Sequence, residues 1–226
     1  MAKLLWKIPL WFFIITVGWV LVLRFVPVFV TPLMVIRYFE PNHSSKSTLT
    51  KKWVPIQKIS PKIVTAVVAS EDDLFLEHQG FSFKDIEKAY QSNKRGKRLR
   101  GGSTISQQTA KNVFTSGART WIRKGFESYF TVLIELLWGK ERIMEVYLNV
   151  VEFGNGVYGV EAASQNYFHK SAQKVNTFEA ALMAAVLPNP GRYSIKNPGP
   201  YMRKRQAQIV QLMWNVGNVD FDKKSR

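Results

Sequence analysis

The residues most able to do chemistry in this chain are two glutamates, Glu71 and Glu127, each set in a polar and basic stretch of sequence. Glu71 is followed directly by two aspartates, and Glu127 comes shortly after Arg123 and Lys124. The segment between the two glutamates is rich in glycine, hydroxyl, amide and cationic residues. Two carboxylates that flank a cationic stretch suit a reaction in which one carboxylate activates a hydroxyl while positive charges stabilise a departing phosphate. Glycosyl transfer from a sugar pyrophosphate is a reaction of this kind.

Glu71 is the candidate general base. His78 could orient the acidic turn that follows it, and Gly80 would permit a tight turn there. The competing interpretation is that the acidic run is a solvated helix end and that His78 is a structural histidine.

Four cations form the candidate phosphate clamp: Lys111, Arg119, Arg123 and Lys124. The planar fork of arginine and the point charge of lysine both stabilise phosphate oxygens. The alternative is a solvated basic face, in which Arg123 pairs with Glu127 four residues further along a helix. Apolar side chains interleave these charges, which predicts that the segment is not wholly exposed. They are Trp121, Ile122 and Phe126.

A block of hydroxyl and amide side chains precedes the clamp. We expect it to be partly structural, through helix capping, and partly substrate-facing. Thr104-x-x-Gln107 matches a capping box, so a helix should begin there and carry Gln108 and Lys111 on adjacent turns. Neither Ser103 nor Thr104 is predicted to be a nucleophile, because no base is adjacent in the sequence.

The N-terminal region predicts one transmembrane helix over residues 8–30, because a span needs about 20 mostly apolar residues. A cleaved signal peptide is the alternative, but its apolar region would be shorter and would end at a small-residue cleavage site. Lys3 and Lys7 place the N-terminus in the cytoplasm by the positive-inside rule, although Arg24 and Arg37 weaken that assignment.

The composition fits a folded protein with a basic surface. The 226 residues are 46% hydrophobic, carry a net charge of +16 and include no cysteine, which excludes disulfides, zinc–thiolate sites and thiol nucleophiles. Nucleic acid, anionic lipid head groups or a phosphorylated ligand could each explain the charge. The predicted anchor favours the last two.

The rest of the chain predicts a mainly α domain. Ser60-Pro61 should begin a helix that ends at or near Glu71, and Asn176-x-x-Glu179 should cap an alanine-rich helix. Alternating strand patterns are nearly absent, and there is no internal repeat. We therefore divide the chain into a cytoplasmic N-terminus (1–7), an anchor (8–30), a linker (31–52) and one domain (53–226).

Five ordered blocks give the chain a resemblance to the monofunctional biosynthetic peptidoglycan glycosyltransferases, which share their domain with the N-terminal half of bifunctional penicillin-binding proteins. The resemblance runs from about Trp53 to Met213. The blocks are Glu71-Asp72-x-x-Phe75-x-x-His78-x-Gly80, Gly102-Ser103-Thr104-Ile105-x-Gln107-Gln108-x-x-Lys111-Asn112, Arg123-Lys124-x-x-Glu127, Lys140-x-Arg142-Ile143-x-Glu145-x-Tyr147-Leu148-Asn149 and Glu152-Phe153-Gly154-x-Gly156-Val157-Tyr158-Gly159.

The resemblance implies a lysozyme-like helical fold with a membrane-dipping smaller lobe, and polymerisation of lipid II. Glu71 would deprotonate the 4-hydroxyl of the acceptor GlcNAc, which attacks the anomeric carbon of the donor MurNAc with inversion and releases undecaprenyl pyrophosphate. Glu127 would assist this departure, and a divalent cation, Mg or Mn, near Glu127 is left open.

The resemblance also assigns binding and supporting residues. Pyrophosphate and substrate contacts fall on Lys111, Arg119, Arg123, Lys124, Ser103, Thr104, Gln107, Gln108 and Asn112, and support of the site falls on Asp72, Phe75, His78 and Gly80. Its implied partners are lipid II, the growing glycan strand, membrane lipids and cell-wall synthesis or division proteins, with no nucleic acid. The implied location is the bacterial plasma (inner) membrane, single-pass, with the catalytic domain outside the cytoplasm. Gly139 departs from the expected serine before Lys140, which should affect a helix boundary only.

Two rival functions fit part of the pattern. A lysozyme-like glycan hydrolase or lytic transglycosylase also uses two carboxylates on a helical fold, but it needs a protonated acid for a poor leaving group. Pyrophosphate leaves readily once its charge is screened, which nearby cations would do. A non-enzymatic membrane-surface binding module would explain the charge but would leave the carboxylate motifs without a role.

Overall fold

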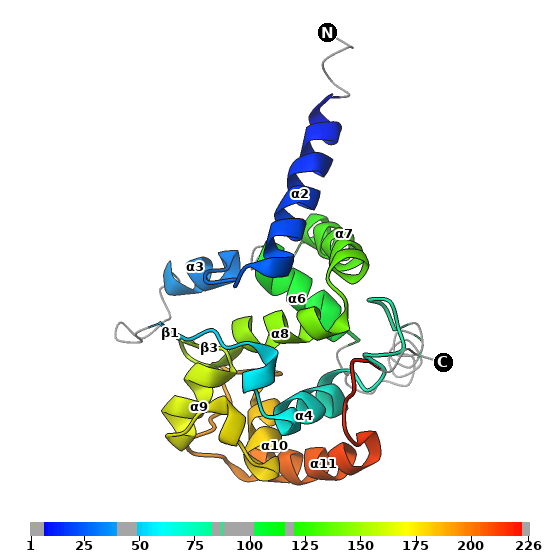
Figure 1. Cartoon of the computed structure of the whole chain (residues 1–226). Helices are drawn as coiled ribbons and strands as arrows, with labels where there is room; N and C mark the ends of the chain where they lie inside the picture. Colours follow the sequence, from blue (N-terminus) through cyan, green and yellow to red (C-terminus); the bar gives the residue numbers. More distant parts are fainter. Residues whose placement is uncertain (1–6, 40–48, 83–86, 88–101, 116–119, 223–226) are drawn as a thin grey trace.

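The chain folds into a mainly helical body from which one long apolar helix projects (Figure 1), as predicted. The computed structural model describes residues 7–39, 49–82, 87, 102–115 and 120–222. The helices are α2 (Lys7–Phe25), α3 (Pro32–Phe39), α4 (Pro61–Glu71), α6 (Ile105–Phe114), α7 (Trp121–Leu137), α8 (Lys140–Val150), α9 (Val160–Phe168), α10 (Thr177–Val186) and α11 (Pro200–Val216), with short 3₁₀ turns η1 (Ile56–Lys58) and η2 (Ala172–Lys174).

Helix α10 is the centre of the part of the body that lies away from α2, where it packs against α4 and α11. The predicted capping box is confirmed: Asn176 Oδ1 accepts from the Glu179 N–H at 3.0 Å, and Glu179 Oε2 accepts from the Asn176 N–H at 2.8 Å. Every residue from Ala180 to Val186 is buried, and the small alanine side chains allow the neighbouring helices to approach closely. This packing fixes the direction of α4, whose last residue is Glu71.

The start of α4 differs from the prediction in one detail. Pro61 occupies the first turn as expected, but the hydroxyl of Ser60 does not cap the helix. It donates instead to the carbonyl of Val175 at 2.9 Å, because the η2 segment lies against the start of α4 and supplies a buried acceptor.

A small three-stranded sheet was not predicted. Strand β3 (Val157–Tyr158) lies between β1 (Thr50–Lys51), with which it is parallel, and β2 (Glu152–Gly154), with which it is antiparallel. Strands of two or three residues are too short to show an alternating pattern. The sheet ties the segment that follows the anchor to the turn between α8 and α9.

The projecting helix α2 ends at Phe25, earlier than the predicted end of the span at Val30. Proline explains the difference, because Pro27 lacks an N–H and disfavours helical geometry at the preceding residue. A second helix, α3, begins at Pro32, inside the range predicted as a linker. With a mean hydropathy of 2.0 and 19 residues, most of them exposed, α2 fits a membrane anchor.

The body holds the end of α2 by its backbone carbonyls. The indole N–H of Trp138 donates to Val20 O at 2.8 Å, and the Arg142 guanidinium donates to Leu23 O at 2.7 Å and Val26 O at 2.6 Å. Lys51 Nζ donates to the carbonyls of Val28 and Phe29, the latter at 2.8 Å. Leu23 O is one of the last four carbonyls of α2, which lack a partner within the helix and carry partial negative charge, so Arg142 both satisfies and stabilises the end of α2.

Helix α7 lies beside α2 (Figure 1). It exposes apolar side chains. The prediction that its start is not wholly exposed was wrong for Trp121 and Ile122, which are 93% and 75% exposed. Phe126 contacts Phe12 of α2, with ring centroids 6.0 Å apart. Apolar exposure of this kind is unfavourable in water, and its position beside an apolar helix long enough to span a bilayer fits contact with lipid.

Gly139 precedes α8 with a φ of +78° and a ψ of 163°, a backbone region that is nearly exclusive to glycine. A serine at this position would be strained although the space around it is open. Gly139 lies at the boundary before α8, and the effect of the departure from serine on that boundary stays a prediction.

Candidate active site

Glu71 lies at the end of α4, where it meets α6. Gln108 of α6 donates from Nε2 to Glu71 Oε2 at 3.0 Å. Burial raises the pKa of Glu71 above the ordinary glutamate value, Asp72 raises it further, and the Gln108 hydrogen bond and the charge of Arg205 lower it. A raised pKa makes this carboxylate a better proton acceptor near neutral pH.

The turn after Glu71 is held by a buried carboxylate. Asp72 accepts from the backbone N–H of Ile105 at 2.9 Å and from His78 Nε2 at 2.9 Å. The other ring nitrogen, Nδ1, accepts from the Gly80 N–H at 3.0 Å, so the ring proton lies on Nε2 and donates to Asp72. His78 therefore orients the turn structurally. Phe75 is fully buried in the same turn, with Lys140 Nζ 4.7 Å from the centre of its ring.

Gly80 joins this turn to the start of α6. Its carbonyl accepts from the Thr104 hydroxyl at 2.7 Å. Its φ is +89°, and a Cβ at this position would lie 2.7 Å from Thr131 Cγ2. Glycine is thus required here both by conformation and by space.

The predicted capping box at the start of α6 is confirmed. Thr104 Oγ1 accepts from the Gln107 N–H at 3.1 Å, and Gln107 Oε1 accepts from the Thr104 N–H at 3.1 Å. With the hydroxyl proton of Thr104 already donated to Gly80, the polar groups of these two residues serve the fold. The structural half of the expectation for Thr104 and Gln107 is confirmed, and their contact with substrate stays a prediction. Asn112 is also buried, whereas Ser103 is partly exposed.

The second glutamate, Glu127 of α7, is buried among cations. Lys124 Nζ lies 2.6 Å from Oε1 and Arg123 Nη1 lies 3.2 Å from Oε2. The Nε of Arg123 is buried and has no hydrogen-bond partner among the residues that the structure describes. Buried donors are rarely left unpaired, so this atom is available to an anionic ligand.

Lys111 of α6 belongs to the same cationic cluster. Burial lowers the pKa of Lys111, Glu127 opposes this, and the charges of Arg123, Arg37 and Lys124 lower it further. These cations therefore repel one another in a partly desolvated position. A site of this kind is stabilised by a bound anion.

Helix α6 connects the two glutamates. Gln108, which binds Glu71, and Lys111, which interacts with Glu127, are three residues apart and so lie on one face of the helix, about 4.5 Å apart along its axis. The helix also packs against both α7 and α8. The proton acceptor and the cationic cluster are therefore neighbours across a single turn of α6.

Two expected features need separate comment. Arg119 lies outside the described residues, so the structure gives it no position. Around Glu127, one carboxylate with both oxygens engaged by cations does not fit a resident divalent metal ion. The described part of the chain holds no group of three or more histidine, aspartate or glutamate residues suited to a metal.

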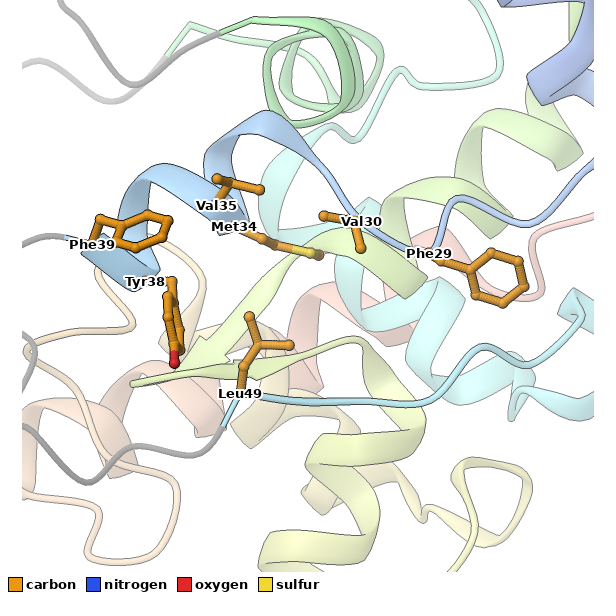
Figure 2. Close-up of a pocket in the computed structure, with 7 residues that line it drawn as sticks. All are labelled: Phe29, Val30, Met34, Val35, Tyr38, Phe39 and Leu49. Carbon is orange, nitrogen blue, oxygen red and sulfur yellow. The ribbon is translucent and has the colours of Figure 1, made fainter.

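An apolar pocket of about 160 Å³ lies at α3, away from both glutamates (Figure 2). Its lining residues are Phe29, Val30, Met34, Val35, Tyr38, Phe39 and Leu49. Only Tyr38 among them has a side-chain oxygen, so the pocket cannot bind a sugar or a diphosphate. Its lining suits a hydrocarbon chain.

Three residues that the sequence analysis did not assign to the site act on it. Tyr147 of α8 donates its hydroxyl to Gln108 Oε1 at 3.1 Å. Arg205 of α11 donates to the Ser70 carbonyl at 3.3 Å, and its charge acts on the neighbouring Glu71. Arg37 of α3 pairs with Glu152 at 3.5 Å and acts on Lys111. All three come from segments distant in sequence, and only the tyrosine lay within a quoted motif.

Comparison with known proteins gives consistent matches over most of the chain. The model of the Transglycosylase family matches residues 40–214. A biosynthetic peptidoglycan transglycosylase of Bdellovibrio bacteriovorus is 54% identical over 211 residues, which cover 93% of this chain and 84% of the relative. Proteins of the same name from Bacteroides thetaiotaomicron (54% over 205 residues, 90% and 83% covered) and Caulobacter vibrioides (50% over 190 residues, 84% and 81% covered) are also similar.

The raised pKa of Glu71 predicts a pH-dependent stability difference for Glu71→Gln. The folded state holds the Glu71 proton more tightly than the unfolded state does, so this stabilisation is full below the ordinary glutamate pKa and is lost as pH rises through the raised value. At neutral pH the variant, which carries no charge to bury, should melt about 2 to 4 °C above wild type, and the difference should vanish in acid. Melting curves between pH 4 and 8 measure this. Glu77→Gln, at an exposed position of the same turn, is the control, and a difference that grows toward acid would contradict the prediction.

Proposed function

The chain belongs to the transglycosylase family, and from this premise we propose that it polymerises lipid II into β-1,4-linked glycan strands with release of undecaprenyl pyrophosphate. As a member of that family it is a peptidoglycan glycosyltransferase. The substrate, the stereochemistry and the roles of individual residues are the proposal.

In the proposed reaction Glu71 takes the proton of the acceptor 4-hydroxyl. The resulting oxygen attacks the anomeric carbon of the donor, the bond from that carbon to the diphosphate oxygen breaks, and the electron pair leaves with the diphosphate. Attack opposite the leaving group inverts the anomeric centre from α to β. Glu71 then returns its proton to solvent. Its raised pKa supports this role, since a base works best with a pKa near the operating pH.

The departing diphosphate would be held by Lys111, Arg123 and Lys124. Partly desolvated cations stabilise developing negative charge more strongly than cations in bulk water. The buried, unpaired Nε of Arg123 is a further donor for a phosphate oxygen. Glu127 would keep this cluster together, since it binds two of the cations at once, and no step is assigned to a metal ion.

The observation that carries the proposal is the arrangement on α6, where Gln108 binds the proposed base and Lys111, three residues later, interacts electrostatically with Glu127, Arg123 and Lys124. A glycan hydrolase would need a protonated acid next to the leaving group. Glu127, with Lys124 and Arg123 bonded to its two oxygens, is a poor candidate for that role.

We expect Glu71→Gln to reduce polymerisation of labelled lipid II by at least about a hundredfold while leaving lipid II binding nearly unchanged, because the amide keeps the shape but cannot accept the proton. Detergent-solubilised protein is incubated with lipid II, and the product is identified by digestion with a muramidase. Glu77→Gln is the matched control. Comparable glycan synthesis by Glu71→Gln would overturn the assignment of the base, and shortening of preformed glycan by wild type would favour a hydrolase.

Arg123→Ala and Lys124→Ala should each weaken donor binding about tenfold and lower turnover with it, because each removes a charge-assisted bond to the diphosphate. Binding and initial rates are measured at two salt concentrations, with Lys62→Ala, an exposed cation on α4, as control. Variants that lose thermal stability but bind and turn over normally once folded would show that the cluster serves only to pair Glu127.

We place the enzyme in the bacterial plasma membrane through α2, with the catalytic domain outside the cytoplasm. The absence of cysteine allows a clean test. A single cysteine at exposed Gln173 should react with a membrane-impermeant maleimide in spheroplasts, whereas one at Lys3, before the span, should react only after permeabilisation. The reverse labelling pattern would show that the catalytic domain lies in the cytoplasm.

A further inference from the structure

A chain of hydrogen bonds reaches Glu71 from the interior of the protein. Tyr147 on α8 donates its hydroxyl to Gln108 Oε1 at 3.1 Å. Gln108 on α6 donates from Nε2 to Glu71 Oε2 at 3.0 Å and to the Ser103 carbonyl at 3.4 Å. Three helices, α8, α6 and α4, are thus joined at the proposed base.

The direction of this chain follows from the chemistry of its members. An ionised carboxylate and a backbone carbonyl can only accept hydrogen bonds, so the amide group that faces both Glu71 and Ser103 must be the NH₂ group. The amide oxygen therefore faces Tyr147, whose hydroxyl must donate. Tyr147 thus adds a third contact that favours the amide orientation required by Glu71 and the Ser103 carbonyl.

We propose that Tyr147 is a positioning residue for the glycosyl transfer: through Gln108 it fixes the Glu71 carboxylate and leaves Oε1 as the oxygen that accepts the acceptor's proton. Among the described residues, no hydrogen bond reaches Oε1. When the proton arrives on Oε1, Oε2 keeps its bond from Gln108, so the carboxyl group does not turn during the reaction. This inference rests on the proposed role of Glu71 as the base.

The surroundings of Tyr147 suit this role. The residue is fully buried on α8, and α8 packs against α6. Burial, and then the charges of Glu71 and Asp72, raise the pKa of Tyr147 well above its ordinary value, so the hydroxyl keeps the proton that it donates. A buried tyrosine has few rotamers, which makes it a more exact donor than a water molecule would be.

Other charged groups near Glu71 do not replace this bond. Arg205 acts on Glu71 from α11 through its charge, and its guanidinium donates a hydrogen bond to the Ser70 carbonyl. Asp72, which follows Glu71, is itself bonded to His78 and to the Ile105 N–H. Loss of the Gln108 bond removes an influence that lowers the pKa of Glu71, so that pKa should rise and the acidic limb of the rate profile should move to higher pH.

The test is a double-mutant cycle of Tyr147→Phe and Gln108→Met in the full-length chain, with two readouts. The first is an infrared titration of the protonated carboxyl band of Glu71, identified by its loss in Glu71→Gln, which needs no substrate. The second is the initial rate of lipid II polymerisation against pH. Tyr167→Phe, which removes a hydroxyl that interacts with the Phe153 carbonyl and the Asn166 side chain and not with Gln108 or Glu71, is the control.

Tyr147→Phe should lower kcat about tenfold at neutral pH with little change in KM, and should shift both the carboxyl titration and the acidic limb upward. The double variant should be no worse than Gln108→Met alone, because the tyrosine acts through the amide. The inference would be overturned if the kcat losses of the two single variants multiplied in the double variant. It would also be overturned if Glu71 in Tyr147→Phe titrated as it does in wild type. If Glu71 titrated as expected in all variants but the wild-type protein did not polymerise lipid II, the proposed function would be overturned. The positioning of Glu71 by Tyr147 through Gln108 would still stand.

Discussion

The hydrogen bond between Gln108 and Glu71 is the contact on which the rest of the site depends. It holds a partly buried carboxylate that burial alone would drive toward its protonated form, and it joins the end of α4 to α6. The capping box of α6 and the Gly80 carbonyl fix the start of α6, and Asp72 fixes its first backbone N–H. A small error in any of these would move the amide relative to the carboxylate, which is why so many buried polar groups converge on one turn.

The two glutamates show how one residue type takes two roles through its surroundings. Glu71 is held by a neutral amide and kept from water, which favours uptake of a proton. Glu127 is held by two cations, Arg123 and Lys124, and its charge also acts on Lys111. The separation is electrostatic, and α6 supplies a residue to each side.

Local features of this molecule could be read from the sequence, and contacts between distant segments could not. Both capping boxes and the end of α4 at Glu71 follow from patterns within a few residues. The grouping of Lys111 with Arg123 and Lys124 was expected from the family blocks. The roles of Tyr147, Arg205 and Arg37 depend on which helices pack together, and no periodicity in one segment reports that. The hydroxyl of Ser60 was expected to cap α4, but it donates to the buried carbonyl of Val175 beside η2. The apolar run predicted a longer α2, but the helix ends at Phe25, before Pro27.

The carbonyls of Val20 and Leu23 in α2 and of Phe29 after it accept hydrogen bonds from Trp138, Arg142 and Lys51, so the helix is held against the body at several points. A flexible tether would let the catalytic centre sample a range of heights and tilts above the lipid surface. A helix held against the body restricts those heights and tilts. The length of the helix and the thickness of the bilayer then set the height of the catalytic centre above the lipid surface. The proposed lipid-linked reactants diffuse in the plane of the same bilayer. Their encounter with the anchored enzyme would then be two-dimensional and would occur at one depth.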